Sequence, residues 1–137
     1  MSLLSVRDLE VEYTTADAPV RAVDDVSLEV SPHSIVGVLG ESGCGKSTLA
    51  KAIMRSLPDN GAITGGSVRL NDEDITEMSP SRLREVRWET IAYVPQSAMG
   101  SLDPVYTIRD QLTEALHAHR TDTTKSEAVE RAKEVLQ

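Results

Sequence analysis

The sequence predicts an α/β fold with a β-rich beginning, a mixed centre and a helical end. Three observations indicate this fold. Apolar and charged residues alternate near the N-terminus, a glycine-rich segment stands between a short apolar run and a stretch with helical spacing, and two capping signatures precede amphipathic stretches near the C-terminus. The chain has 137 residues, of which 39% are hydrophobic, so it is long enough to bury a core. Because Phe is absent, we expect that core to consist of Val, Leu, Ile and Ala.

The composition excludes several classes of protein. Asp and Glu number 22 against 14 Lys and Arg, and this net charge of −8 disfavours non-specific binding of nucleic acid. It fits a salt-tolerant surface or an ordinary solvated acidic face. The single cysteine, Cys44, excludes an internal disulfide framework and a multi-cysteine metal site. The longest apolar run, residues 35–39, is too short to span a membrane, and the N-terminus lacks an apolar signal region.

Two strands are expected first. Residues 4–13 alternate between apolar and charged side chains, with a shift of phase at Arg7 and Asp8. Residues 14–19 are typical of a turn, and the alternation resumes in residues 20–30, which we expect to form the second strand.

The centre predicts three short strands and one helix. Residues 35–39 and 91–94 are continuous apolar runs, typical of strands that are buried on both faces. Residues 58–66 are rich in Gly and Pro and predict a loop, followed by a strand over residues 67–70. Between the predicted strands of residues 35–39 and 67–70, apolar residues recur at helical spacing and predict a helix. These residues are Leu49, Ala50, Ile53, Met54 and Leu57.

The remaining elements are predicted to be helical. Ser79 and Pro80 are an N-cap and a first helical residue, and they predict a short helix toward Trp88, which we expect to pack between that helix and the next strand. Residues 96–104 are loop-like. Thr107 and Thr124 each begin a capping-box pattern ahead of an apolar helical stripe. The last stripe stops in mid-pattern at Gln137, as expected of a fragment cut inside a domain.

Residues 40–47 match the pattern G-x-x-x-x-G-K-[ST] in full. Such a loop wraps phosphate with backbone N–H groups, and the positive end of the following helix points to the same place. We expect Lys46 to reach the β- and γ-phosphates, the Ser47 hydroxyl to ligate Mg²⁺, and Thr48 to bond an α-phosphate. The alternative is a chance match, against which the preceding strand and the following helix argue. The predicted nucleotide contacts of this segment are Gly40, Ser42, Gly43, Cys44, Gly45, Lys46, Ser47 and Thr48.

The flanking residues identify a family. Tyr13, after the first strand, and Gln96, after the strand of residues 91–94, make the sequence resemble the ATP-binding subunit of ABC transporters. In that family the aromatic residue stacks on adenine, although Tyr13 has the simpler alternative of packing on its neighbours. The resemblance implies that Gln96 contacts Mg²⁺ and the attacking water, and that Lys46 and Gln96 are the catalytic residues.

The loop after Gln96 narrows the resemblance. Residues 96–104 read Q-S-A-M-G-S-L-D-P and are similar to the dipeptide, oligopeptide and nickel importer branch, with Asp103 where Asn is usual. Residues 20–27 and 63–66 also fit that branch. The implied architecture is an incomplete P-loop NTPase of the ABC type. It has an antiparallel β subdomain and the first part of the α/β core over residues 1–95, and the Q-loop with the start of a helical subdomain over residues 96–137. The family's signature motif, its second acidic strand and its switch histidine lie outside the chain.

The resemblance implies a transport ATPase that couples ATP binding and hydrolysis to uptake of peptides or a related solute, nickel included. The implied cofactors are ATP and Mg²⁺. The implied partners are transmembrane permease subunits, a second ATP-binding subunit and, indirectly, an extracytoplasmic solute-binding protein, with no nucleic acid. The expected location is the cytoplasmic face of the cell membrane. We expect these 137 residues alone to bind ATP without hydrolysing it. The alternatives are a nucleotide-binding module without hydrolysis and a soluble ABC-type ATPase that is not tied to transport.

Overall fold

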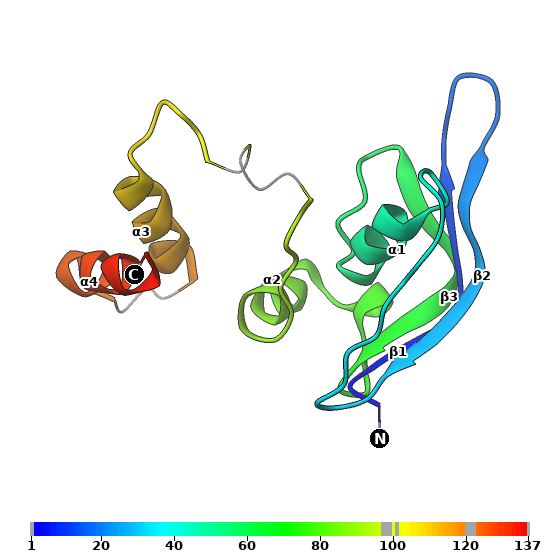
Figure 1. Cartoon of the computed structure of the whole chain (residues 1–137), viewed down its shortest axis with the longest axis horizontal. Helices are drawn as coiled ribbons and strands as arrows, with labels where there is room; N and C mark the ends of the chain where they lie inside the picture. The colour runs from blue at the N-terminus through cyan, green and yellow to red at the C-terminus, as the bar shows by residue number, and fades with distance from the viewer. Residues whose placement is uncertain (1, 97–99, 101, 120–122, 137) are drawn as a thin grey trace. The chain divides into compact units, whose positions relative to one another are not determined.

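The computed structural model describes residues 2–96, 100, 102–119 and 123–136. The chain folds as two compact units, Met1–Arg87 and Trp88–Gln137. The first unit holds the sheet and the helices α1 and α2, and the second holds the helices α3 and α4 (Figure 1). The units divide near the end of α2. The division at residue 95 that the family resemblance implies stays a prediction.

The first unit is built on an antiparallel sheet with the strand order β2-β1-β3-β4. The strands β1 (Leu4–Tyr13) and β2 (Val20–Val30) have the predicted bounds, and the register between them pairs Tyr13 with Val20. The third strand, β3 (Gly61–Leu70), pairs with the other edge of β1, and the two-residue strand β4 (Glu73–Asp74) pairs with its end. The antiparallel β subdomain that the sequence predicts is confirmed.

A bulge in β1 explains why the alternation of apolar and charged residues shifts its phase within residues 4–13. It also explains why the first part of β3 was predicted to be a loop. Asp8 has a left-handed backbone with φ 47°, and the register with β2 and with β3 shifts around it. Opposite it, Gly66 has φ 76°, and a Cβ there would collide with the carbonyl oxygens of Arg7 and Asp8. The predicted loop over residues 58–66 is therefore wrong from Gly61 onward. Its glycines stand inside a strand, where they allow two backbones to approach closely.

The helix α1 (Lys46–Ile53) packs on the sheet and buries Leu49 and Ala52 (Figure 1). The one-turn helix η1 (Ile75–Glu77) and the helix α2 (Pro80–Glu89) follow β4. The Ser79 hydroxyl caps α2 as predicted, since it accepts a hydrogen bond from the Arg82 amide. The core is aliphatic, as the composition predicts, with Met54 added; its most buried large side chains are Val6, Leu9, Val11, Val68 and Ile75.

The predicted strands over residues 35–39 and 91–94 are wrong, because both segments are irregular. Ile35 is 100% exposed and Leu39 is 96% exposed, and in the other segment Val94 is 83% exposed. A strand exists through hydrogen bonds to a neighbour, and neither segment pairs with another strand among the described residues. The apolar side chains of these two segments are therefore largely exposed.

The second unit holds α3 (Ile108–His119) and α4 (Lys125–Val135), which contact each other. Both predicted capping signatures are confirmed. The Thr107 hydroxyl accepts a hydrogen bond from the Asp110 amide, and Thr124 forms a complete capping box with Glu127. Trp88 does not pack on a strand, since residues 91–94 form none. It stacks instead on the His119 ring, with the centroids 4.2 Å apart. None of the helices that the structure describes is long and apolar enough to cross a membrane.

Candidate functional site

The glycine-rich loop of residues 40–45 joins the exposed residues 35–39 to α1. Two of its glycines have backbone conformations that other residues rarely adopt. Gly43 has φ 83° and Gly45 has φ 96°. Gly45 is also the N-cap of α1, and a Cβ there would collide with the Ala22 carbonyl oxygen of β2. The glycine therefore lets the start of the helix lie directly against the second strand.

The loop wraps around the ammonium group of Lys46. Its Nζ donates hydrogen bonds to the carbonyl oxygens of Gly40 at 2.8 Å and Glu41 at 2.5 Å, and lies 3.5 Å from the Cys44 sulfur. Carbonyl oxygens solvate an ammonium group without neutralising its charge. Among the described residues no carboxylate lies within ion-pair distance of Lys46, so the loop encloses a positive charge.

The start of α1 adds to this positive field. Its N-cap glycine offers no side-chain acceptor, and its first turn contains no acidic residue. The free N–H groups of that turn therefore lack a side-chain partner, and the helix dipole is not offset there. The exposed Ser47 hydroxyl and the half-buried Thr48 hydroxyl lie in the same turn. Such a site attracts an anion, and a hydroxyl oxygen is a hard donor that suits Mg²⁺.

Tyr13 lies beside this helix, although it is far from the loop in sequence. Its Oη is 3.3 Å from the Thr48 Oγ1, within hydrogen-bond distance. Its ring lies over Gly61, where a Cβ would approach the Tyr13 Cε1 to 2.7 Å. Tyr13 thus packs on its neighbours, as the simpler interpretation of the sequence holds, and it reaches the predicted phosphate site. Stacking of this ring on adenine stays a prediction.

A cleft of about 370 Å³ lies between β2, the loop and the start of α1. No motif in the sequence predicts the β2 wall of this cleft. The signal that could have found it is the pairing of β2 with the end of β1, which brings Val20 opposite Tyr13 and Arg21 opposite Glu12. The lining residues are Arg21, Ala22, Val23, Asp24, Val26, Val38, Leu39, Cys44, Gly45, Lys46 and Leu49.

Carboxylates balance the second cation of this cleft. Arg21 pairs with Asp24 at 2.8 Å, Glu12 at 3.2 Å and Glu10 at 3.6 Å. Hydrogen bonds from Arg21 to Asp24 and Glu12, with the charge of Glu10, raise the pKa of its guanidinium. The attraction of this cleft for an anion therefore rests on Lys46 and the start of α1 rather than on Arg21.

Gln96 belongs to the second unit and is exposed. Its predicted place beside the loop therefore remains a prediction. Within the predicted loop of residues 96–104, residues 97–99 and 101 lie outside the described residues, and residues 102–104 form no helix or strand. In the part of the chain that the structure describes, no group of three His, Cys, Asp or Glu side chains could hold a metal ion.

Comparison with known proteins gives a consistent result. A family model described as "ABC transporter" matches residues 23–137. The chain is 35% identical over 134 residues to the dipeptide transport ATP-binding protein DppD of Caldanaerobacter subterraneus, covering 98% of the chain and 41% of that protein. It is 41% identical over 135 residues to the probable peptide ABC transporter ATP-binding protein y4tR of Sinorhizobium fredii, covering 98% and 40%. The chain thus spans about two fifths of the length of these relatives.

The fold also matches solved structures. A bacterial ABC transporter cassette, MJ0796, solved as a dimer, superposes with a TM-score of 0.81 at 23% identity, covering 97% of this chain and 55% of that one. A post-hydrolysis state of the same cassette, bound to ADP and Pi, gives a TM-score of 0.80 at 22% identity, with the same coverage. At this identity the likeness establishes the fold, and the predicted ABC-type P-loop fold is confirmed over the part of the cassette that the chain covers.

Proposed function

Since this chain belongs to the ABC transporter family, we propose that it is the nucleotide-binding part of an importer ATPase that takes up peptides or a related solute. ATP is the proposed ligand, held by residues 40–48, with the adenine stacked on Tyr13. The names of the relatives support a peptide as the solute, and nickel is the other solute class of the branch that the sequence resembles.

One observation carries the nucleotide site. Tyr13 ends β1 and Thr48 lies in the first turn of α1, yet their side chains lie within hydrogen-bond distance. A planar aromatic ring is thereby held next to a loop that encloses a cation and a helix start that attracts anions. A nucleotide offers the matching pair of groups, a planar base and a chain of phosphates.

The proposed chemistry is positioning and charge stabilisation. The Lys46 ammonium would leave the carbonyl oxygens of Gly40 and Glu41 and contact the β- and γ-phosphates. Mg²⁺, when bound, would neutralise phosphate charge, with the Ser47 hydroxyl as one ligand. Gln96 would contact the same ion and the attacking water, as the family resemblance implies.

The proposed partners are permease subunits in the membrane, a second ATP-binding subunit, identical or related, and, through the permease, a solute-binding protein outside the cell. The proposed location is the cytoplasmic face of the membrane, where the protein binds peripherally. These 137 residues alone are proposed to bind ATP without hydrolysing it, because they contain neither the signature motif nor the catalytic glutamate that the family resemblance implies for hydrolysis.

Calorimetric titration with MgATP, combined with an assay of phosphate release, tests this proposal. The expected result is saturable binding without phosphate release. Lys46→Ala should weaken the binding about a hundredfold, because it removes a charged phosphate contact, equal to about 3 kcal/mol. Lys51→Ala, which removes the same charge farther along α1, should change the affinity less than about twofold. Equal affinities of the two variants would refute the site, and rapid phosphate release would refute the division between binding and hydrolysis.

A further inference from the structure

Arg87 closes the end of α1 that lies opposite the loop. Its Nη2 donates to the Met54 carbonyl oxygen at 2.8 Å and to the Arg55 carbonyl oxygen at 2.5 Å, and its Nε donates to Met54 at 3.0 Å. Met54 is the C-cap of α1, and Arg55 follows it with a left-handed φ of 50°. One planar guanidinium thus provides hydrogen-bond donors for the carbonyl group of the C-cap and for that of the residue after it.

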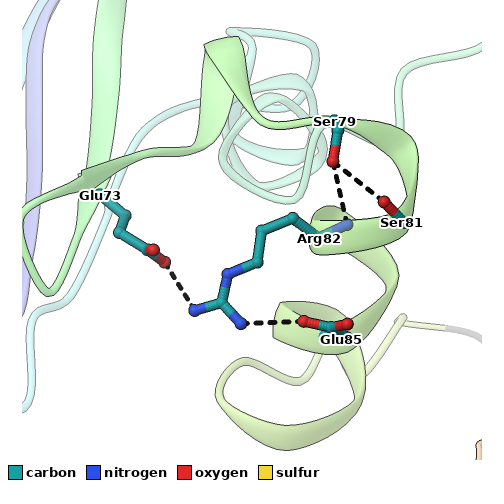
Figure 2. Close-up of polar contacts among 5 residues, drawn as sticks. All are labelled: Glu73, Ser79, Ser81, Arg82 and Glu85. Carbon is teal, nitrogen blue, oxygen red and sulfur yellow. Dashed lines mark hydrogen bonds and ion pairs between the residues drawn. The ribbon is translucent and has the colours of Figure 1, made fainter.

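The helix that presents Arg87 is itself held at its start. Figure 2 shows Arg82 between two carboxylates, Glu73 of β4 at 2.8 Å and Glu85 of α2 at 3.0 Å, next to the capping Ser79. Hydrogen bonds to Glu73 and Glu85 raise the pKa of the Arg82 guanidinium. In the same helix, Leu83 and Val86 are buried. The sheet and the core therefore fix the direction of α2 before the chain reaches Arg87.

Arg55 links the end of α1 to a second segment, the turn around η1. Its Nη1 donates to the Met78 carbonyl oxygen at 2.6 Å and to the Ile75 carbonyl oxygen at 3.3 Å, so the residue that follows α1 is tied to the turn around η1. The end of α1 is thus held by two arginines, one from each side. A cation at a helix C-terminus also offsets the negative end of the helix dipole.

Because α1 is short, the position of its C-terminal end affects the position of the phosphate-binding loop. The helix has eight residues and is therefore about 12 Å long. A short helix tilts as a rigid body, so freedom at Met54 becomes movement at Gly45. Gly45 fits closely there, since a Cβ at this residue would collide with β2.

We infer that Arg87 is a positioning residue for the phosphate-binding loop. It holds the C-terminal end of α1 and thereby fixes the helix start where the phosphates would bind. This inference rests on the proposed function. Arg87 does not touch the nucleotide in this account; it acts through α1.

The test compares three variants of α2. Arg87→Met removes all three donated hydrogen bonds, and Arg87→Lys keeps the charge but cannot form the planar fork. Arg84→Met is the matched control. Arg84 is an exposed arginine on the same helix, and it has no hydrogen bond or ion pair among the described residues. Titration with MgADP should show affinity weakened about tenfold in Arg87→Met, about threefold in Arg87→Lys and less than twofold in Arg84→Met. Equal affinities in all three would overturn the inference.

A second control separates positioning from loss of stability. Val68→Ala removes buried volume from β3 and should lower the melting temperature about as much as Arg87→Met does. At a temperature where both variants are fully folded, the MgADP affinity should stay near wild type in Val68→Ala and fall in Arg87→Met. Equal loss of affinity in the two variants would reduce Arg87 to a structural residue and overturn the inference.

Hydrogen exchange without nucleotide distinguishes this inference from the proposed function. The amides of Leu49–Met54 should exchange about tenfold faster in Arg87→Met than in wild type, and at the wild-type rate in Arg84→Met. If the wild-type chain binds no nucleotide, the proposed function fails, and the exchange rates alone decide whether Arg87 holds α1. Equal exchange in Arg87→Met and Arg84→Met would then overturn the inference.

Discussion

Two kinds of apolar segment occur in this chain, and they behave in opposite ways. The strand β1 alternates apolar and polar residues, pairs with a neighbour on each edge, and buries Val6, Leu9 and Val11. Residues 35–39 are continuously apolar, yet they are irregular and mostly exposed. The difference shows that a strand with one buried face can be completed by antiparallel neighbours close in the chain. A strand buried on both faces needs partners on both edges, and the described residues offer none to residues 35–39.

The largest effect that this comparison predicts is in the core. Leu9→Ala should lower the free energy of unfolding by about 3 kcal/mol, because Leu9 is completely buried and its loss leaves a cavity. The matched change Leu39→Ala should cost less than about 0.5 kcal/mol, because Leu39 is already in solvent. Urea denaturation followed by circular dichroism measures both values. A larger loss in Leu39→Ala than in Leu9→Ala would show that residues 35–39 are covered in solution.

A second prediction uses two glycines. Gly66→Ala should destabilise the chain by about 2 kcal/mol, because φ at this residue is 76° and the new Cβ would meet two carbonyl oxygens of β1. Gly37→Ala should be nearly neutral, because nothing lies within 4 Å of the new Cβ. Thermal unfolding of the two variants checks the difference. Similar melting temperatures for the two variants would mean that the bulge between β1 and β3 does not form.

A third prediction concerns two tyrosines, one at the end of β1 and one in the unpaired residues 91–94. Tyr13→Phe should cost about 1 kcal/mol, because it removes the hydrogen bond between the Tyr13 Oη and Thr48. Tyr93→Phe should change stability by less than about 0.3 kcal/mol, because this exposed hydroxyl has no partner among the described residues. Chemical denaturation of both variants provides the test, and equal stability would argue against a link between β1 and α1.

The smallest expected effect is at α4, which completes its first turn with its own side chains. Hydrogen bonds from the Thr124 hydroxyl and from the Thr124 backbone amide lower the pKa of Glu127 below its ordinary value of 4.5. A lowered pKa means that the ionised form stabilises the fold at pH values above 4.5. That contribution is lost as the pH falls below 4.5 through the lowered pKa. The NMR shift of the Thr124 amide should follow this titration in wild type and stay flat in Glu127→Gln. A Thr124 amide shift that follows pH equally in wild type and in Glu127→Gln would contradict the capping box.

Much of the fold follows from local patterns. Alternation gave the bounds of β1 and β2, and capping residues gave the starts of α2, α3 and α4, because these signals depend on neighbours in the sequence. The start of β3 was missed, because Gly61, Gly65 and Gly66 are typical of a loop. Only the pairing with β1 reveals that a bulge and the Tyr13 ring require them.

The candidate site was likewise only partly predictable from the sequence. The loop of residues 40–48 was predictable, because its chemistry lies in one contiguous motif. The family resemblance implied a role for Tyr13 on adenine, but neither its contact with Thr48 nor the β2 wall of the cleft was predicted. Arg87 carries no motif at all. Its role appears only when the end of α1 and the end of α2 are seen to meet.

Amide NMR of the chain during titration with MgATP tests whether Tyr13 and residues 40–48 form one nucleotide site. The amides of Tyr13 and of residues 40–48 should shift most, with the sheet residues around Val6 and Val68 unchanged. Lys46→Ala should abolish these shifts at the same concentrations. Shifts that spare residues 40–48, or that persist unchanged in Lys46→Ala, would contradict a single site formed by Tyr13 and this loop.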